Sequence, residues 1–199
     1  SRTDRQGQEY LPHPLQTQLE ALRNRSLSRV HWRRVLRLFS GTSQASRLKN
    51  TIRRVSKRYG TTPGIRLERK QQLLIAVDTS ASIQAEELSA FFDEIHHLWR
   101  LGAQLMVLAV DTEIREQYAY KGRRNLDVSG RGGTEFEPVF SFAKNQWKPD
   151  GIIYFTDGYG PPPQTKVSQP VLWLITSQGI KPDDDSWQEL PGRKVKMTI

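Results

Sequence analysis

Apolar residues in the second part of the chain fall into short continuous runs that alternate with helically spaced faces. Four runs have the length of buried strands: 72–77, 104–110, 151–156 and 171–176. Between them, residues 84–101 and 136–145 place apolar side chains at helical spacing, and Gly102 is expected to end the first of these helices. Strands that are apolar throughout and alternate with helices indicate a mostly parallel sheet covered on both faces.

Two further segments complete a predicted sheet of six strands. Residues 113–120 follow the tight link Asp111–Thr112 and are expected to pair antiparallel to 104–110. Residues 194–199 alternate apolar and polar side chains, as an edge strand does. The predicted fold class is therefore α/β: a Rossmann-like, open, mostly parallel six-stranded sheet with one antiparallel strand and helices on both faces.

Two helices are predicted in the N-terminal part of the chain. Residues 14–24 have leucines at helical spacing, and Ser28 is placed to cap a second helix. The apolar face of this second helix consists of Trp32, Val35, Leu36 and Phe39. The sequence GTSQ at residues 41–44 is expected to end it.

Charge divides the chain near residue 70. Residues 1–70 carry 17 Lys and Arg against 4 Asp and Glu, and the remaining residues carry 13 against 17, so the net charge of +9 is the sum of +13 and −4. Residues 45–69 are interrupted by glycine and proline and are interpreted as a mostly extended connector. We therefore predict a small basic helical N-terminal segment with its connector at 1–70 and an α/β domain at 71–199.

The basic segment has two interpretations that the sequence leaves open. A surface that docks a protein partner or packs against another domain is favoured, because few aromatic residues interleave with the charges and no nucleic-acid module is recognised. Arginine-rich segments also bind phosphate backbones without sequence preference, so nucleic-acid binding stays open. The candidate contact residues in either case are Arg33, Arg34, Arg37, Arg53, Arg54, Lys57 and Arg58.

Composition narrows the class of protein further. The chain has no cysteine, so disulfides and thiolate metal sites are excluded, and a cytoplasmic location is expected. The longest apolar runs are strand-sized and well short of the roughly 20 residues that a membrane span needs. We therefore expect no contact with a membrane.

The strand predicted at 72–77 ends in a group of oxygen-bearing side chains, within the sequence LLIAVDTSASIQ at residues 73–84. The strand predicted at 151–156 ends in a second carboxylate, and a glycine-rich loop is flexible enough to bring a further hydroxyl to the same point. Because the carboxyl ends of parallel strands meet at one edge of a sheet, these side chains are expected to converge. They are Asp78, Ser80, Ser82, Thr134 and Asp157.

Two carboxylates and three hydroxyls form a donor set made of oxygen alone. Hard oxygen ligands suit Mg²⁺, and secondarily Mn²⁺ or Ca²⁺. Five side chains leave a sixth position open, and two negative charges leave a divalent ion electrophilic. The sequence therefore predicts a cation that binds an exposed Asp or Glu of a protein partner.

Three motifs in this order resemble a known family. DTSAS at 78–82, GGT at 132–134 and TDG at 156–158 resemble the metal-ion-dependent adhesion site (MIDAS) of von Willebrand factor A (VWA) domains. The resemblance covers about residues 71–199 and implies the VWA fold, with the five residues named above as cation ligands. Ala81 is a departure, because the family usually has glycine there and alanine reaches positive φ less freely.

The flanking sequence narrows the resemblance. HWRRVL at 31–36 and TIRRVSKRYGTTPGIRL at 51–67 are similar to bacterial VWA-like proteins of a metallopeptidase-type family. That resemblance implies a metallopeptidase-like segment upstream and a MoxR-type AAA+ ATPase as partner. These 199 residues contain no HExxH motif, so the chain itself is not expected to be an enzyme.

Other interpretations of the same residues are less favoured. A metal-dependent hydrolase is the alternative function, but it needs a general base beside the ion and none is evident. A haloacid-dehalogenase-like phosphatase needs a second Asp two residues after Asp78, where Ser80 stands. A structural turn in which Asp78 caps the following helix is the alternative without a metal. Asp111 is interpreted as a turn residue away from the site.

Overall fold

The structure is a computed structural model. It describes residues 31–42, 47–55, 63–68, 71–80, 82–123 and 133–198, with the backbone alone for 47–55 and 63–68. The helix predicted at 14–24 and the positions of Ser28, Lys57, Arg58 and Ala81 lie outside the described residues.

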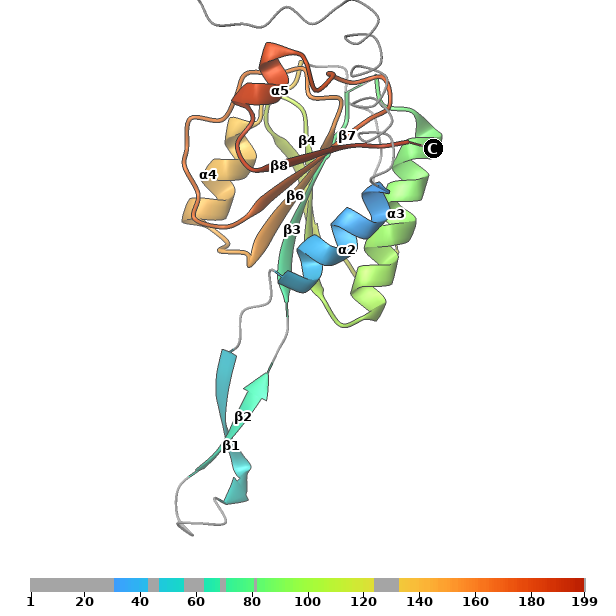
Figure 1. Cartoon of the computed structure of the whole chain (residues 1–199). Helices are drawn as coiled ribbons and strands as arrows, with labels where there is room; N and C mark the ends of the chain where they lie inside the picture. The colour runs from blue at the N-terminus through green and yellow to red at the C-terminus, as the bar shows by residue number, and fades with distance from the viewer. Residues whose placement is uncertain are drawn as a thin grey trace, which may run out of the picture. The chain divides into compact units, whose positions relative to one another are not determined.

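The central sheet has six strands in the order β5-β4-β3-β6-β7-β8 (Figure 1). In chain order they are β3 (Gln72–Asp78), β4 (Gln104–Val110), β5 (Ile114–Ala119), β6 (Gly151–Thr156), β7 (Val171–Ile175) and β8 (Arg193–Lys196). All neighbours pair parallel except β5, which is antiparallel to β4. The predicted α/β class and its single antiparallel strand are confirmed, as is the position of the last strand at an edge.

Helices cover both faces of this sheet. The helices α2 (Trp32–Thr42) and α3 (Ala85–Arg100) lie on one side and α4 (Glu137–Asn145) on the other (Figure 1). Alternate residues of β3 enter different hydrophobic clusters: Leu73 packs with α2 and α3, whereas Leu74 packs with α4. A strand buried on both faces must be apolar at every position, which explains the continuous runs in the sequence.

The helix α2 shares the core of the sheet. Its Trp32, Val35, Leu36 and Phe39 are buried in the same cluster as α3. Residues Trp32–Ile199 form one compact unit, which includes α2. The division into 1–70 and 71–199 stays a prediction, and the apolar face of α2 accounts for its packing in the core of the sheet despite the basic composition of its other face.

The connector predicted at 45–69 forms a paired structure. Strand β1 (Arg47–Val55) runs antiparallel to β2 (Pro63–Glu68), with Leu48 opposite Leu67 and Lys49 opposite Arg66. The extended backbone is as expected, but the interpretation as a simple connector is wrong. Alternating side-chain character along the two strands was the available signal for a hairpin.

A short helix closes the last crossover. This helix is α5 (Asp185–Glu189), and the Asp184 carboxylate just before it accepts a hydrogen bond from the Lys181 amide (2.6 Å). Within the described residues, no helix combines the length and the apolar character that crossing a membrane requires.

Candidate metal centre

The two carboxylates of the predicted site follow adjacent parallel strands. Val77 of β3 lies opposite Phe155 of β6, so the two strands end side by side. Asp78 is the last residue of β3, and Asp157 follows the last residue of β6. The sheet register therefore brings together residues that are 79 positions apart in the sequence.

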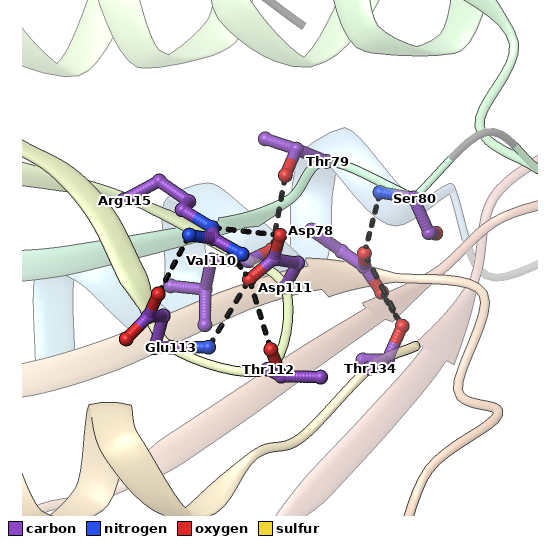
Figure 2. Close-up of polar contacts among 9 residues, drawn as sticks. All are labelled: Asp78, Thr79, Ser80, Val110, Asp111, Thr112, Glu113, Arg115 and Thr134. Carbon is purple, nitrogen blue, oxygen red and sulfur yellow. Dashed lines mark hydrogen bonds and ion pairs between the residues drawn. The ribbon is translucent and has the colours of Figure 1, made fainter. Parts of the chain in front are cut away.

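Asp78 is enclosed, with 0% of its surface exposed. Its Oδ1 accepts a hydrogen bond from the Ser80 amide (2.9 Å), and its Oδ2 accepts one from the Thr134 hydroxyl (3.2 Å), as Figure 2 shows. The Thr156 hydroxyl donates a shorter bond to Oδ2 (2.7 Å). Amide and hydroxyl donors from three segments thus hold this carboxylate in place.

Asp157 anchors the other half of the cluster. The Ser82 hydroxyl donates to its Oδ2 (2.5 Å) and lies 3.0 Å from the Ser80 hydroxyl oxygen. The Tyr159 amide donates to its Oδ1 (3.0 Å). All five residues predicted from the sequence therefore lie in one cluster, which we call the oxygen cluster: Asp78, Ser80, Ser82, Thr134 and Asp157.

The electrostatics of the oxygen cluster favour a cation. Burial raises the pKa of Asp78, the charge of Asp157 adds to this rise, and hydrogen bonds from Thr156 and Ser80 only partly oppose it. A divalent cation would reverse the cost of ionising Asp78, and oxygen donors of this kind are those that Mg²⁺ prefers. Within the described residues, no three His, Cys, Asp or Glu side chains gather to hold a metal. A cation here would therefore depend on the hydroxyls as well as on the two carboxylates.

Asp111 adjoins the oxygen cluster through its backbone. It follows β4, and its carboxylate accepts bonds from the Arg115 guanidinium (2.9 Å) and the Glu113 amide (3.1 Å), as a turn residue does (Figure 2). Its carbonyl accepts a bond from the Glu135 amide (2.8 Å), next to Thr134. The expectation that Asp111 lies away from the site is wrong, since it supports the Thr134 loop.

Comparison with known proteins gives the family. A family model described as VWA-like domain (DUF2201) matches residues 73–190. The chain belongs to this VWA-like family. An uncharacterized protein of Thermotoga maritima is 30% identical over 133 residues, which is 65% of this chain and 34% of that protein. The chain thus spans about a third of the length of that relative, and the match to the family model includes the whole oxygen cluster.

The structure also shows a supporting residue of the VWA-like domain that the sequence analysis missed. Thr156 lies in β6, is fully buried, and both donates to Asp78 and accepts a bond from the Gly158 amide (3.0 Å). A hydroxyl in an otherwise apolar strand, directly before Asp157, was the available signal. The amide of Tyr159 could not be found in this way, because every residue carries one.

The basic candidates lie on other parts of the VWA-like chain. Arg33, Arg34 and Arg37 are exposed on α2. Both carboxylate oxygens of Glu94 on α3 accept a hydrogen bond from the Arg37 guanidinium, one of them at 3.0 Å. Arg53 and Arg54 belong to β1, where only the backbone is described. The structure therefore places Arg37 at the contact between α2 and α3.

Proposed function

We propose that the VWA-like domain is a protein-interaction module that holds a divalent cation in the oxygen cluster and binds an acidic side chain of a partner through that cation. Membership of the VWA-like family points to a protein-interaction or metal-related module. The observation that carries the finer proposal is the convergence of two carboxylates and three hydroxyls from separate segments. It is this arrangement that corresponds to the MIDAS of the resemblance.

The donor set fits Mg²⁺ first, with Mn²⁺ and Ca²⁺ as alternatives. The ligands would be Asp78, Ser80, Ser82, Thr134 and Asp157. When bound, the cation supplies positive charge and a coordination position that an external carboxylate can fill. Two protein carboxylates balance the +2 charge without reversing its sign, so an acidic partner group can still fill the open coordination position.

The residues of the chain itself prepare this contact. Thr156 and the Ser80 amide orient Asp78, and the Tyr159 amide orients Asp157. Groups that are already oriented lose little conformational freedom when a ligand arrives, which favours binding. The exposed Ser82 leaves the oxygen cluster open to the outside.

A MoxR-type AAA+ ATPase is the first partner to test. This choice rests on the resemblance to bacterial VWA-like proteins given above, in which such ATPases accompany the domain. In that role the domain would act as an adaptor that presents its cation to an acidic residue of the ATPase.

Titration calorimetry tests the cation directly. Wild-type protein is expected to bind Mg²⁺ or Mn²⁺, and Asp78→Asn or Asp157→Asn should weaken that affinity by about a hundredfold or more, since each removes a charged ligand. Asp183→Asn is the matched control, because Asp183 is exposed and lies outside the oxygen cluster. Absence of binding by the wild type, or equal binding by all four proteins, would contradict the proposal.

We propose binding rather than catalysis. Within the described part of the chain, the hydrogen bonds to Asp78 and Asp157 come from hydroxyls and backbone amides, and a hydrolase would need a base poised beside the ion. A metal-dependent turnover lost in Asp157→Ala would favour the hydrolase instead.

A further inference from the structure

A second surface lies at the amino ends of the parallel strands, opposite the end that carries the oxygen cluster. A pocket of about 210 Å³ opens where the chain enters β3 and β4, beside the amino ends of these strands. The oxygen cluster lies beyond their carboxyl ends, so the two features are separated by the length of the strands. The pocket walls include Arg37, Gly41, Gln71, Leu98, Leu101 and Ala103.

The walls of this pocket are held in place. The Gln71 side-chain amide donates to the Ser40 carbonyl, which ties the start of β3 to the end of α2. Arg37 is tied to the buried Glu94 of α3. Leu98 of α3 is buried in the hydrophobic cluster that also includes α2. These contacts fix the shape of the pocket before any ligand arrives.

The size of the pocket suits a single side chain. Sites for small molecules and cofactors usually enclose about 300–1,000 Å³, more than this pocket offers. One Leu, Met or Phe side chain is a better match in volume, and such anchors in preformed pockets supply much of the energy of protein–protein contacts.

Two exposed apolar side chains lie on, or directly after, the helices that form the pocket. Leu101 is 71% exposed and lines the pocket, and Leu38 is 53% exposed. Leu38 lies three residues before Gly41 on α2, so the two share a face of that helix. Large apolar side chains that remain in water on a pocket rim are typical of a surface that a partner covers.

The charge around the pocket is positive. Arg33 and Arg34 are exposed on α2, and Arg100 is exposed beside Leu101. An occupant of this surface therefore gains from negative charge.

We propose that this surface, formed by α2, the end of α3 and the start of β3, binds an acidic segment of a partner protein. The segment inserts one large apolar side chain into the pocket, and its carboxylates face the α2 arginines. The contact needs no cation, so it is independent of the oxygen cluster and of the function proposed for it.

Selection from a library of random peptides of about twelve residues, displayed on phage and presented to the full chain in EDTA, tests this inference. The enriched peptides should share one large apolar residue flanked by Asp or Glu. EDTA removes any contribution from a cation, so loss of metal binding in other experiments would leave this result unaffected.

Two variants connect the selected peptides to the pocket. Gly41→Leu adds bulk to the pocket wall, where a Cβ would meet no atom within 4 Å. Leu101→Asp places a negative charge on the rim, which would repel the carboxylates of the peptide. Each should weaken binding of the selected peptides by about tenfold or more. Asn145→Asp adds the same charge on the exposed surface of α4 and should leave binding within about twofold.

Three outcomes would overturn the inference. They are enrichment of peptides without acidic residues, equal affinity of both pocket variants and the wild type, and no enrichment at all. Tighter binding of a random DNA oligonucleotide than of any selected peptide, at the same salt concentration, would assign the basic surface to nucleic acid instead.

Discussion

Asp78 and Asp111 are two aspartates at the ends of neighbouring parallel strands, and the protein treats them differently. Asp111 has its counter-charge within the chain: burial opposes its ionisation, but hydrogen bonds from Arg115 and the turn amides outweigh this and lower its pKa. Asp78 is held by hydroxyls and an amide, and burial raises its pKa.

The difference shows how a structural carboxylate can be told from a candidate ligand. Both residues follow an apolar strand, and both are buried. A carboxylate that is paired with an arginine is already stabilised in its ionised form, so a metal ion adds little. A buried carboxylate with only neutral donors lacks a counter-charge, so a metal ion stabilises its ionised form much more. Changing one carboxylate or its surroundings at a time tests this difference.

Removing the Asp111 side chain should have the largest effect on stability. Asp111→Ala deletes the bonds to Arg115 and to the Glu113 amide and should lower the free energy of unfolding by about 2 kcal/mol. Urea denaturation at pH 7 measures the change. The affinity of the Asp111→Ala variant for Mg²⁺ should fall only modestly, because the backbone carbonyl at position 111 still holds the Glu135 amide. A loss of Mg²⁺ affinity as large as that of Asp78→Asn would contradict the distinction between the two aspartates.

Thr156→Val should sharpen the role of the neutral donors around Asp78. The change keeps the shape of the buried side chain but removes the hydroxyl that donates to Asp78, so the affinity for Mn²⁺ should fall about tenfold, or ~1.4 kcal/mol. Thr79→Val is the matched control, because the Thr79 hydroxyl bonds the Val110 carbonyl and not a carboxylate (3.3 Å, Figure 2). Calorimetry that shows equal losses in the two variants would exclude a specific role for Thr156.

Asp78→Asn should stabilise the protein when no cation is present. The pKa of Asp78 is higher in the folded protein than in the unfolded chain, so the protonated form of Asp78 favours folding. This contribution is fully present below about pH 3.8 and is lost as the pH rises through the raised pKa. At pH 7 in EDTA the neutral amide should therefore raise the free energy of unfolding by about 1 kcal/mol. The gain should vanish near pH 3. A loss of stability at pH 7 would show that Asp78 serves the fold itself.

Glu137 provides a third carboxylate and the smallest expected effect. Hydrogen bonds from Thr165, with further ones from Gln164 and Ser141, lower its pKa to about 2. Its stabilising contribution is therefore present above about pH 4.5 and is lost as pH falls toward 2. Glu137→Gln should cost about 0.5–1 kcal/mol at pH 7, after allowance for solvent screening, and almost nothing near pH 2. A cost that is the same at both pH values would exclude this charge as its source.

The elements of the sheet were predictable because buried parallel strands leave a strong pattern. Continuous apolar runs give β3, β4, β6 and β7, and the rule that parallel strands end at one edge brings Asp78 and Asp157 together. Ser80 and Ser82 follow Asp78 in the same turn, whereas Thr134 could be named only from the flexible glycine-rich loop and the resemblance.

Features that depend on the exact geometry of turns and pairings were harder to predict. The pairing of β1 with β2 left only a weak alternating pattern and depends on register, and the pairing of Asp111 with Arg115 depends on how the turn folds back. The pocket at the amino ends of β3 and β4 is bounded by the end of α2, where the Gln71 side chain bonds the Ser40 carbonyl. The sequence of α2 indicates only an apolar face.

Anomalous scattering from a crystal of the full chain soaked in Mn²⁺ tests the central claim most directly. The account predicts one strong peak among Asp78, Ser80, Ser82, Thr134 and Asp157, and no peak at Asp111. A crystal with these side chains bonded only to one another and to water, or with manganese bound at Asp111 instead, would contradict it.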